Sequence, residues 1–479
     1  MSPLFLTAYY SLQGDYCRGV TRYVLTWNSM DHLRALLRTA LSEPRTKPWA
    51  EFLDIAVTTL NLNQKTTKPA IELGALASHI AHNRDSHLTQ LVKGNELQVL
   101  ALDFLRKQPS YQFNPTNLKR HPTDNWIDFT FIDLFAGIGG FHLALSSQGG
   151  TLAFASEIDN SARTTYAMNF GVVPFGDIRA FTRSASGDPR PLREISEIIP
   201  RADIIAAGFP CQPFSLAGVS SRNYHGIEHG LKCEAQGTLF EDILLVARAT
   251  KPDALILENV RNLASHDSGE TIRVIRSEIA KAGYQIFPKW DDSKSWAVIN
   301  SLSVIGQRRK RVFMVCIRND LAKNLASSKG PFELPKFSLK KRKYSLRQVI
   351  KADNEHSDET KFKLYGISKK LWLSHQKRDK NHALKNNGFR TNLMTDLKEP
   401  APTLVARYYK DGKDCLIPHK DRNRPPRMLT PRECGLLQTF PSTFWIPNSK
   451  TPAYKQFGNA ITVEVARIIA RSLTSYLYT

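Results

Sequence analysis

Residues 129–140, FTFIDLFAGIGG, join a short β-rich run to a glycine-rich turn. The run is apolar almost throughout, which is typical of a strand that is covered on both faces of a sheet. Glycines directly after such a strand let the backbone turn tightly and approach a ligand where a helix begins. The turn reads G-x-G-G and not the full G-x-G-x-x-G fingerprint, so a plain strand-to-helix connection is the alternative interpretation. The stretch predicts the first strand and helix of an α/β domain.

Further β-rich runs follow this stretch, and helical patterns separate them. The alternation predicts a doubly wound, Rossmann-like α/β domain with a mostly parallel sheet. A last helix over about 462–478 carries apolar residues on one face, so we expect the chain to return to this domain at its end. The further runs span residues 152–158, 203–207, 254–258, 296–304 and 311–317.

The composition is that of a globular chain with a strong basic excess. Of 479 residues, 42% are hydrophobic and 23% charged, which excludes a fibrous or largely disordered protein. Lys and Arg number 66 against 44 Asp and Glu, a net charge of +22 that indicates a polyanionic partner, most often nucleic acid. We expect no membrane span, because no run of about 18 apolar residues occurs. Six scattered cysteines without a C-x-x-C pair predict free thiols, a reducing cytoplasm and no metal site.

Charge and pattern divide the chain into four parts. Residues 1–125 carry helical spacing and predict an accessory region, and 126–320 hold the α/β pattern. Residues 321–420 contain 23 Lys and Arg and 10 Asp and Glu, a net +13. We therefore interpret 321–425 as an inserted nucleic-acid-binding domain, with a solvated insertion as the alternative, and 426–479 as the return to the first domain.

Two acidic residues strengthen the first candidate site. Glu157 ends the second β-rich run, 20 residues after Gly137, where a carboxylate can accept both ribose hydroxyls. Asp177 follows in GDIR, where it is placed to meet an adenine amino group. Together with the glycine turn they predict a site for a nucleoside-bearing cofactor. Taken separately, they are compatible with ordinary surface carboxylates.

The second candidate site is the loop GFPCQPFS, residues 208–215. It places the Cys211 thiol beyond the end of a predicted parallel strand, where such sheets bind ligands. Two prolines stiffen the loop, and the glycines that follow it favour a mobile lid. A buried cysteine that acts as a small hydrophobe is the alternative.

The third candidate site combines an acid and two arginines. Glu258 ends an apolar strand, where a dry pocket raises a carboxyl pKa and lets the group hold a proton; a helix-capping acid is the alternative. Alternation sends Arg309 and Arg311 to the same side of the last strand. Two guanidinium groups there suit a phosphate or a base carbonyl oxygen, although clustered basic residues usually form a solvated face.

Nine segments occur in the order found in the cytosine-5 DNA methyltransferase family, which the chain therefore resembles. The resemblance covers about 129–318 and 425–465 and is nearest to the bacterial Dcm type through GFPCQPFSLAGVS, AQGTLF and ARYYKDG. The nine segments are FAGIGG, SEID, GDIR, GFPCQPFS, GTLF, ENV, QRRKR, RMLTPREC and QFGNA.

The resemblance implies a base-flipping enzyme that uses S-adenosyl-L-methionine and double-stranded DNA. Its catalytic positions match Cys211 for the covalent adduct, Glu258 for the acid, and Arg309 and Arg311 for holding the base. At position 158 this chain has Ile where relatives often have Trp. The implied cofactor residues are Phe135, Gly137, Gly139, Glu157, Ile158, Asp177, Ile178, Leu239 and Asn459. The DNA-contact candidates are Ser215, Arg407, Tyr408, Lys410 and Asp411.

Two other functions share some of these features. An RNA cytosine-5 methyltransferase uses the same catalytic design, but the basic insertion is long enough to read a duplex and favours DNA. A DNA-binding regulator that acts through residues 1–125 is the alternative of a different class. We expect a monomeric restriction-modification or orphan methylase of the bacterial cytoplasm or nucleoid, and ARYYKDG points to a CC(A/T)GG-type site.

Overall fold

The computed structural model describes residues 127–184, 186–210, 239–288, 297–337, 345–386 and 390–479. The predicted helical region 1–125, Cys211 and Ser215 lie outside the described residues.

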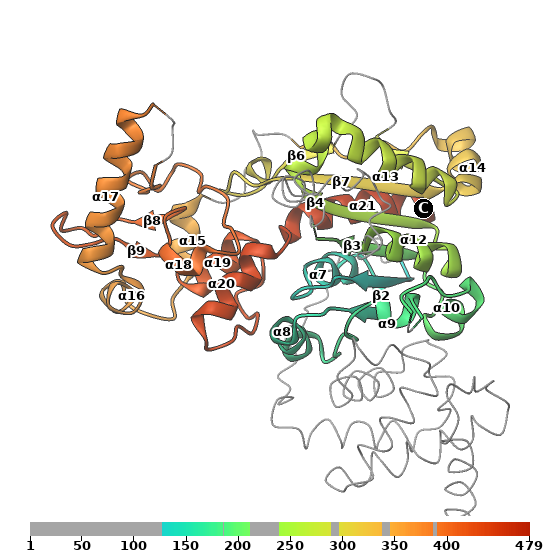
Figure 1. Cartoon of the computed structure of the whole chain (residues 1–479), viewed down its shortest axis with the longest axis horizontal. Helices are drawn as coiled ribbons and strands as arrows, with labels where there is room; N and C mark the ends of the chain where they lie inside the picture. The colour runs from blue at the N-terminus through green and yellow to red at the C-terminus, as the bar shows by residue number, and fades with distance from the viewer. Residues whose placement is uncertain (1–126, 185, 211–238, 289–296, 338–344, 387–389) are drawn as a thin grey trace, which may run out of the picture.

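A mixed sheet forms the centre of the larger lobe (Figure 1). Its order is β2-β1-β3-β4-β7-β5, with β6 also paired to β7. The first four strands are parallel, and β7 runs antiparallel to β4, β5 and β6. This confirms the predicted α/β class, although the sequence patterns did not predict β5. The strands are β1 (Phe129–Leu134), β2 (Gly150–Ser156), β3 (Ile204–Gly208), β4 (Ala254–Val260), β5 (Tyr284–Phe287), β6 (Ala297–Asn300) and β7 (Lys310–Arg318).

Alternate side chains of the strands build two cores, one on each face of the sheet. In β1, Ile132 and Leu134 belong to one core, whereas Phe129 and Phe131 belong to the other. Helices α9, α10, α12 and α13 cover the first face, and α7, α14 and α21 cover the second. The helices of this lobe are α7 (Gly140–Ser146), α8 (Asn160–Phe170), α9 (Arg179–Thr182), α10 (Leu192–Ile198), α12 (Leu239–Thr250), α13 (Glu270–Lys281), α14 (Asn319–Lys329) and α21 (Val463–Tyr478), with 3-10 turns at Arg261–Gly269 and Ser301–Ser303.

A smaller lobe lies beside the sheet, drawn in orange and red in Figure 1. A third core includes Leu346, Leu404, Leu429 and Phe457 and extends to Leu143 and Ala162 of the larger lobe. Because α19 and α20 pack in this core, we propose that the chain rejoins the larger lobe at α21 and not at residue 426. The elements of the smaller lobe are α15 (Leu346–Ala352), α16 (Asp358–Tyr365), α17 (Lys369–Leu384), α18 (Tyr408–Asp411), β8 (Leu416–Ile417), β9 (Arg427–Met428), α19 (Pro431–Leu437) and α20 (Lys450–Asn459).

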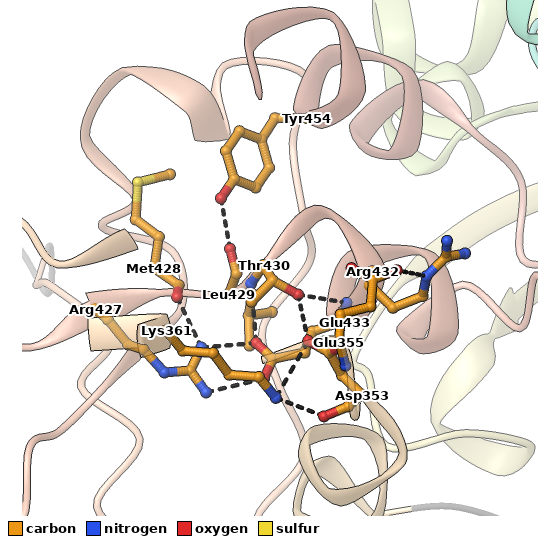
Figure 2. Close-up of polar contacts among 10 residues, drawn as sticks. All are labelled: Asp353, Glu355, Lys361, Arg427, Met428, Leu429, Thr430, Arg432, Glu433 and Tyr454. Carbon is orange, nitrogen blue, oxygen red and sulfur yellow. Dashed lines mark hydrogen bonds and ion pairs between the residues drawn. The ribbon is translucent and has the colours of Figure 1, made fainter. Parts of the chain in front are cut away.

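A buried charge cluster joins α15, α16 and α19 (Figure 2). Arg427 donates two hydrogen bonds to the Glu433 carboxylate, at 2.7 and 2.9 Å. The Lys361 Nζ lies 3.2 Å from Asp353 Oδ2 and 3.6 Å from Glu433 Oε1. Thr430 caps α19 and donates its hydroxyl hydrogen to Asp353 at 2.7 Å. Two cations and two carboxylates therefore balance one another inside the lobe, as buried charges require.

Candidate active site

The glycine turn after β1 holds a carboxylate from the end of β2. Gly137 N–H donates to Glu157 Oε2 at 2.8 Å, and Asp159 N–H donates to Glu157 Oε1 at 2.7 Å. Burial raises the pKa of Glu157. Gly137 has a φ of +55°, and a Cβ there would enter open space. The turn therefore has room for a ligand above its backbone, beside the acid that the sequence predicts for a ribose.

The other predicted cofactor residues differ in their exposure. Ile158 is 64% exposed, and Asn459 is exposed at the end of α20. Ile178 is buried, and the neighbouring Asp177 carboxylate accepts hydrogen bonds from Arg179, the shortest at 2.6 Å. Its role toward adenine stays a prediction. Phe135, with a φ of +55°, and Leu239, at the start of α12, are partly buried beside the first core.

Asp133 is a site residue that the sequence reasoning missed. It lies in β1, four residues before Gly137, and it is fully buried. Neither carboxylate oxygen has a side-chain partner in the described part of the chain, and the backbone N–H of His142 lowers its pKa only in part. Burial and the nearby charge of Glu157 raise the pKa of Asp133 well above its ordinary value. An orphaned acid beneath an open glycine turn fits a polar ligand, and the signal was an aspartate inside an otherwise apolar strand.

A second cluster lies where β3 and β4 end. Gly208 pairs in register with Glu258, and a Cβ on Gly208 would lie 3.6 Å from Glu258 Oε2. The Arg311 Nε is 3.1 Å from Glu258 Oε1. Burial raises the pKa of Glu258, and the charges of Arg311 and Arg309 lower it in part. The cluster therefore holds a carboxyl group that is shielded from water, beside the strand that precedes Cys211.

Asn259 anchors the chain that enters this loop, a role that the sequence reasoning also missed. Its side-chain amide donates to the carbonyl oxygen of Phe209 at 3.1 Å, and both residues are buried. The start of the GFPCQPFS segment is thus fixed to the end of β4.

Arg309 does not take the predicted place beside a base. It is 1% exposed and donates hydrogen bonds to three backbone carbonyls. The distances are 2.8 Å to Leu404 O, 3.0 Å to Gly458 O and 2.7 Å to Ala460 O. The prediction of a base contact for Arg309 is corrected, because the guanidinium group is engaged by the backbone of two distant segments.

The predicted DNA contacts in the smaller lobe differ in their exposure. Arg407 and Lys410 are exposed on and beside α18. Tyr408 is buried, donates its hydroxyl hydrogen to Cys415 O and accepts from Leu429 N–H at 2.9 Å. The predicted DNA contact of Tyr408 is therefore wrong, since its side chain belongs to the lobe's core. The side chain of Asp411 lies outside the described part of the structure.

Residues 129–475 match the family model of the C-5 cytosine-specific DNA methylases. The chain belongs to this family. It is a DNA cytosine methyltransferase, and the family uses S-adenosylmethionine. The open glycine turn and the orphaned Asp133 fit that cofactor.

Relatives of the methylase come from several bacteria. It is 37% identical to the DNA-cytosine methyltransferase of Escherichia coli K12 over 72% of this chain and 77% of that one. It is 36% identical to the type II methyltransferase M.DsaV of Dactylococcopsis salina, over 72% and 86% of the two chains. A DNMT2 variant from Spodoptera frugiperda shares the fold, with a TM-score of 0.51 at 18% identity, over 73% and 99%.

The described residues contain neither a membrane-spanning helix nor a metal-binding cluster. None of the helices there is both long and apolar enough to span a membrane. Within the same residues, no group of three His, Cys, Asp or Glu side chains is arranged to hold a metal ion.

Proposed function

We propose that the enzyme methylates carbon 5 of a cytosine that is flipped out of a specific duplex site, through a covalent adduct with Cys211. The observation that carries this proposal is the buried Glu258, paired with Arg311 beside the strand end that leads into GFPCQPFS. This arrangement supports a base pocket with an acid on one side and a thiol arriving from the adjacent strand. Flipping costs a few kcal/mol, because the base leaves its stack.

The residues of this pocket have separate tasks in the proposed reaction. S-adenosylmethionine supplies the methyl group. The Cys211 thiolate adds to carbon 6 of the ring, and the displaced electron pair makes carbon 5 nucleophilic. Glu258 holds a proton at ring nitrogen 3, and Arg311 faces the ring carbonyl oxygen where negative charge develops. After methylation, carbon 5 loses its proton to a base and the Cys211 sulfur departs, which restores the ring.

We propose that the smaller lobe reads the DNA sequence in the bacterial cytoplasm. The net +13 of residues 321–420 supports phosphate binding, and the exposed Arg407 and Lys410 support contacts next to the target. The segment ARYYKDG carries the proposal of a CC(A/T)GG-type site. The names of type II relatives support a restriction-modification role.

Bisulfite sequencing of DNA from a host that expresses the full chain tests this function. We expect new methylated cytosines at one sequence context, and none with Cys211→Ser. Methylation by Cys211→Ser at a tenth of the wild-type rate would contradict the covalent route. Modified cytosines confined to RNA would contradict the DNA substrate.

A further inference from the structure

We propose that Arg309 is a positioning residue that couples DNA engagement at Arg407 to cofactor binding at Asn459. The inference rests on the proposed function, in which Arg407 contacts DNA, and on the cofactor contact that the sequence predicts for Asn459. It assigns Arg309 a place between these two contacts and not at the base.

The hydrogen bonds of Arg309 reach both sides of Asn459. Its Nη2 donates to Gly458 O and Ala460 O, the carbonyls of the residues that flank Asn459. Its Nη1 donates to Leu404 O, three residues before Arg407. One planar guanidinium group thus fixes the backbone of both functional segments at once, which its fork of donors allows.

The two segments also touch directly. A Cβ on Gly458 would lie 2.4 Å from both the carbonyl carbon and the oxygen of Val405. No side chain fits between them, so the backbone of Val405 lies against that of Gly458. A displacement of one segment therefore moves the other, because close-packed backbone does not absorb such shifts.

The approach to this crossing is held by the chain just before β7. Ala401 N–H donates to Gly306 O at 2.6 Å, and Arg308 N–H donates to Ala401 O at 2.8 Å. The Thr403 hydroxyl donates to Arg308 O at 2.6 Å. Residues 401–403 are thus fixed to the chain just before β7, the strand that carries Arg311 to Glu258. DNA that pulls on Arg407 therefore acts on the segment that Arg309 holds at Leu404.

Coupling between two ligands is reciprocal, so it is measured from either side. The probe pair is S-adenosylhomocysteine and a target duplex, with the full-length protein. We expect the duplex to tighten S-adenosylhomocysteine binding by about five-fold or more, within the usual range of such couplings. Arg309→Lys keeps the charge but cannot span three carbonyls, and we expect it to bring this factor close to one.

Arg308→Lys is the matched control. Arg308 is the adjacent residue, with a 58% exposed side chain that pairs with Glu399 at 3.3 Å. It should keep the wild-type coupling factor. Equal loss of both affinities in Arg309→Lys, with an unchanged factor, would show a merely structural role and overturn the proposal. A wild-type factor of one would overturn it as well.

Hydrogen exchange on the wild-type enzyme keeps the proposal testable if Arg309→Lys fails to fold. Target DNA alone should change exchange at residues 456–461, and S-adenosylhomocysteine alone should change it at 401–407. Absence of both effects would overturn the inference. Methylation of the duplex by the same preparation shows separately whether the proposed function stands.

Discussion

At the scale of a single residue, the burial of Glu258 determines the protonation state of its carboxyl group. The side chain is almost fully buried, and its ion pair with Arg311 at 3.1 Å does not cancel the loss of hydration. Its pKa is raised, so the protonated form persists above the ordinary value of 4.5. A carboxyl group in this state suits the holding of a proton at ring nitrogen 3.

Replacing Glu258 with Gln tests this role. We expect kcat to fall by about 100-fold or more, because proton placement by a side chain contributes at least that much. The wild-type kcat should also decline as the pH rises through the raised pKa of Glu258, and this limb should vanish in the variant. Glu399→Gln removes a 63% exposed acid and serves as the control. If the variant kept the decline of kcat with rising pH, the titrating group would be a residue other than Glu258.

Asp133 makes a prediction about stability and pH. A carboxyl group with a raised pKa stabilises the fold below its ordinary value of 3.8, and this contribution is lost as the pH rises through the folded value. Asp133→Asn does not titrate. The difference in Tm should therefore shift in favour of the variant between pH 4 and pH 8, measured by thermal melting without cofactor. A difference that is constant with pH would mean that Asp133 ionises as readily in the folded protein as in the unfolded chain.

At the scale of a single element, helix α17 exposes part of the basic excess on one of its faces. Lys370, Lys377 and Lys380 are exposed on one face, at spacings of seven and three residues. None of the three takes part in an ion pair or hydrogen bond with the residues that the structure describes. The one acid of the helix, Asp379, is held by Thr391 and Arg378. We therefore expect this face to contact DNA phosphates.

Changing these three lysines to Gln should weaken DNA binding to every sequence alike. Each lost phosphate contact removes about 0.9 from the slope of log K against log salt, so a total of nearly three is the upper bound. Gel-shift titrations at several salt concentrations give this slope. Lys323→Gln on α14, exposed on the larger lobe, is the control and should leave the slope unchanged. An unaltered slope in the triple variant would place the DNA elsewhere.

Sequence patterns predicted the helices and strands more reliably than they predicted the contacts of individual side chains. Alternation along the chain indicated the α/β class, and the apolar stripe of the last helix agrees with α21 (Val463–Tyr478). The strand β5 (Tyr284–Phe287) was missed because four residues give too short a pattern. The predictions for Tyr408 and Arg309 were wrong because the sequence does not show whether a polar side chain donates its hydrogen bonds to backbone carbonyls. The Arg309 acceptors are 95 to 151 residues away in sequence, which no local pattern encodes.

The described part of the chain forms two lobes, and the smaller one contains a cluster of buried charges (Figure 2). Lys361 and Arg427 face Asp353 and Glu433, and all four are buried. Such a cluster is balanced only when complete, because removing one member leaves an unpaired charge without water. The lobe that we propose to read DNA thus owes its internal arrangement to pairings between α15, α16 and α19.

Lys361→Met tests this dependence. We expect a loss of about 3–5 kcal/mol in the free energy of unfolding of the lobe, the usual cost of breaking a buried pair. Urea unfolding monitored by hydrogen exchange at residues 345–386 measures it. Lys363→Met is the control, since Lys363 is exposed on the same helix. Equal effects of the two variants would contradict the role of the cluster.

The covalent route through Cys211 is the central claim, and trapping tests it most directly. A duplex with 5-fluorocytosine at the target allows thiolate addition and methyl transfer, but the fluorine cannot leave as a proton does, so the sulfur stays attached. Denaturing electrophoresis and peptide mass spectrometry with the full-length enzyme then locate the adduct. We predict a denaturation-resistant complex on Cys211 that forms only when S-adenosylmethionine is present. An adduct on Cys233, or methyl transfer to unmodified DNA without any trapped complex, would contradict the account.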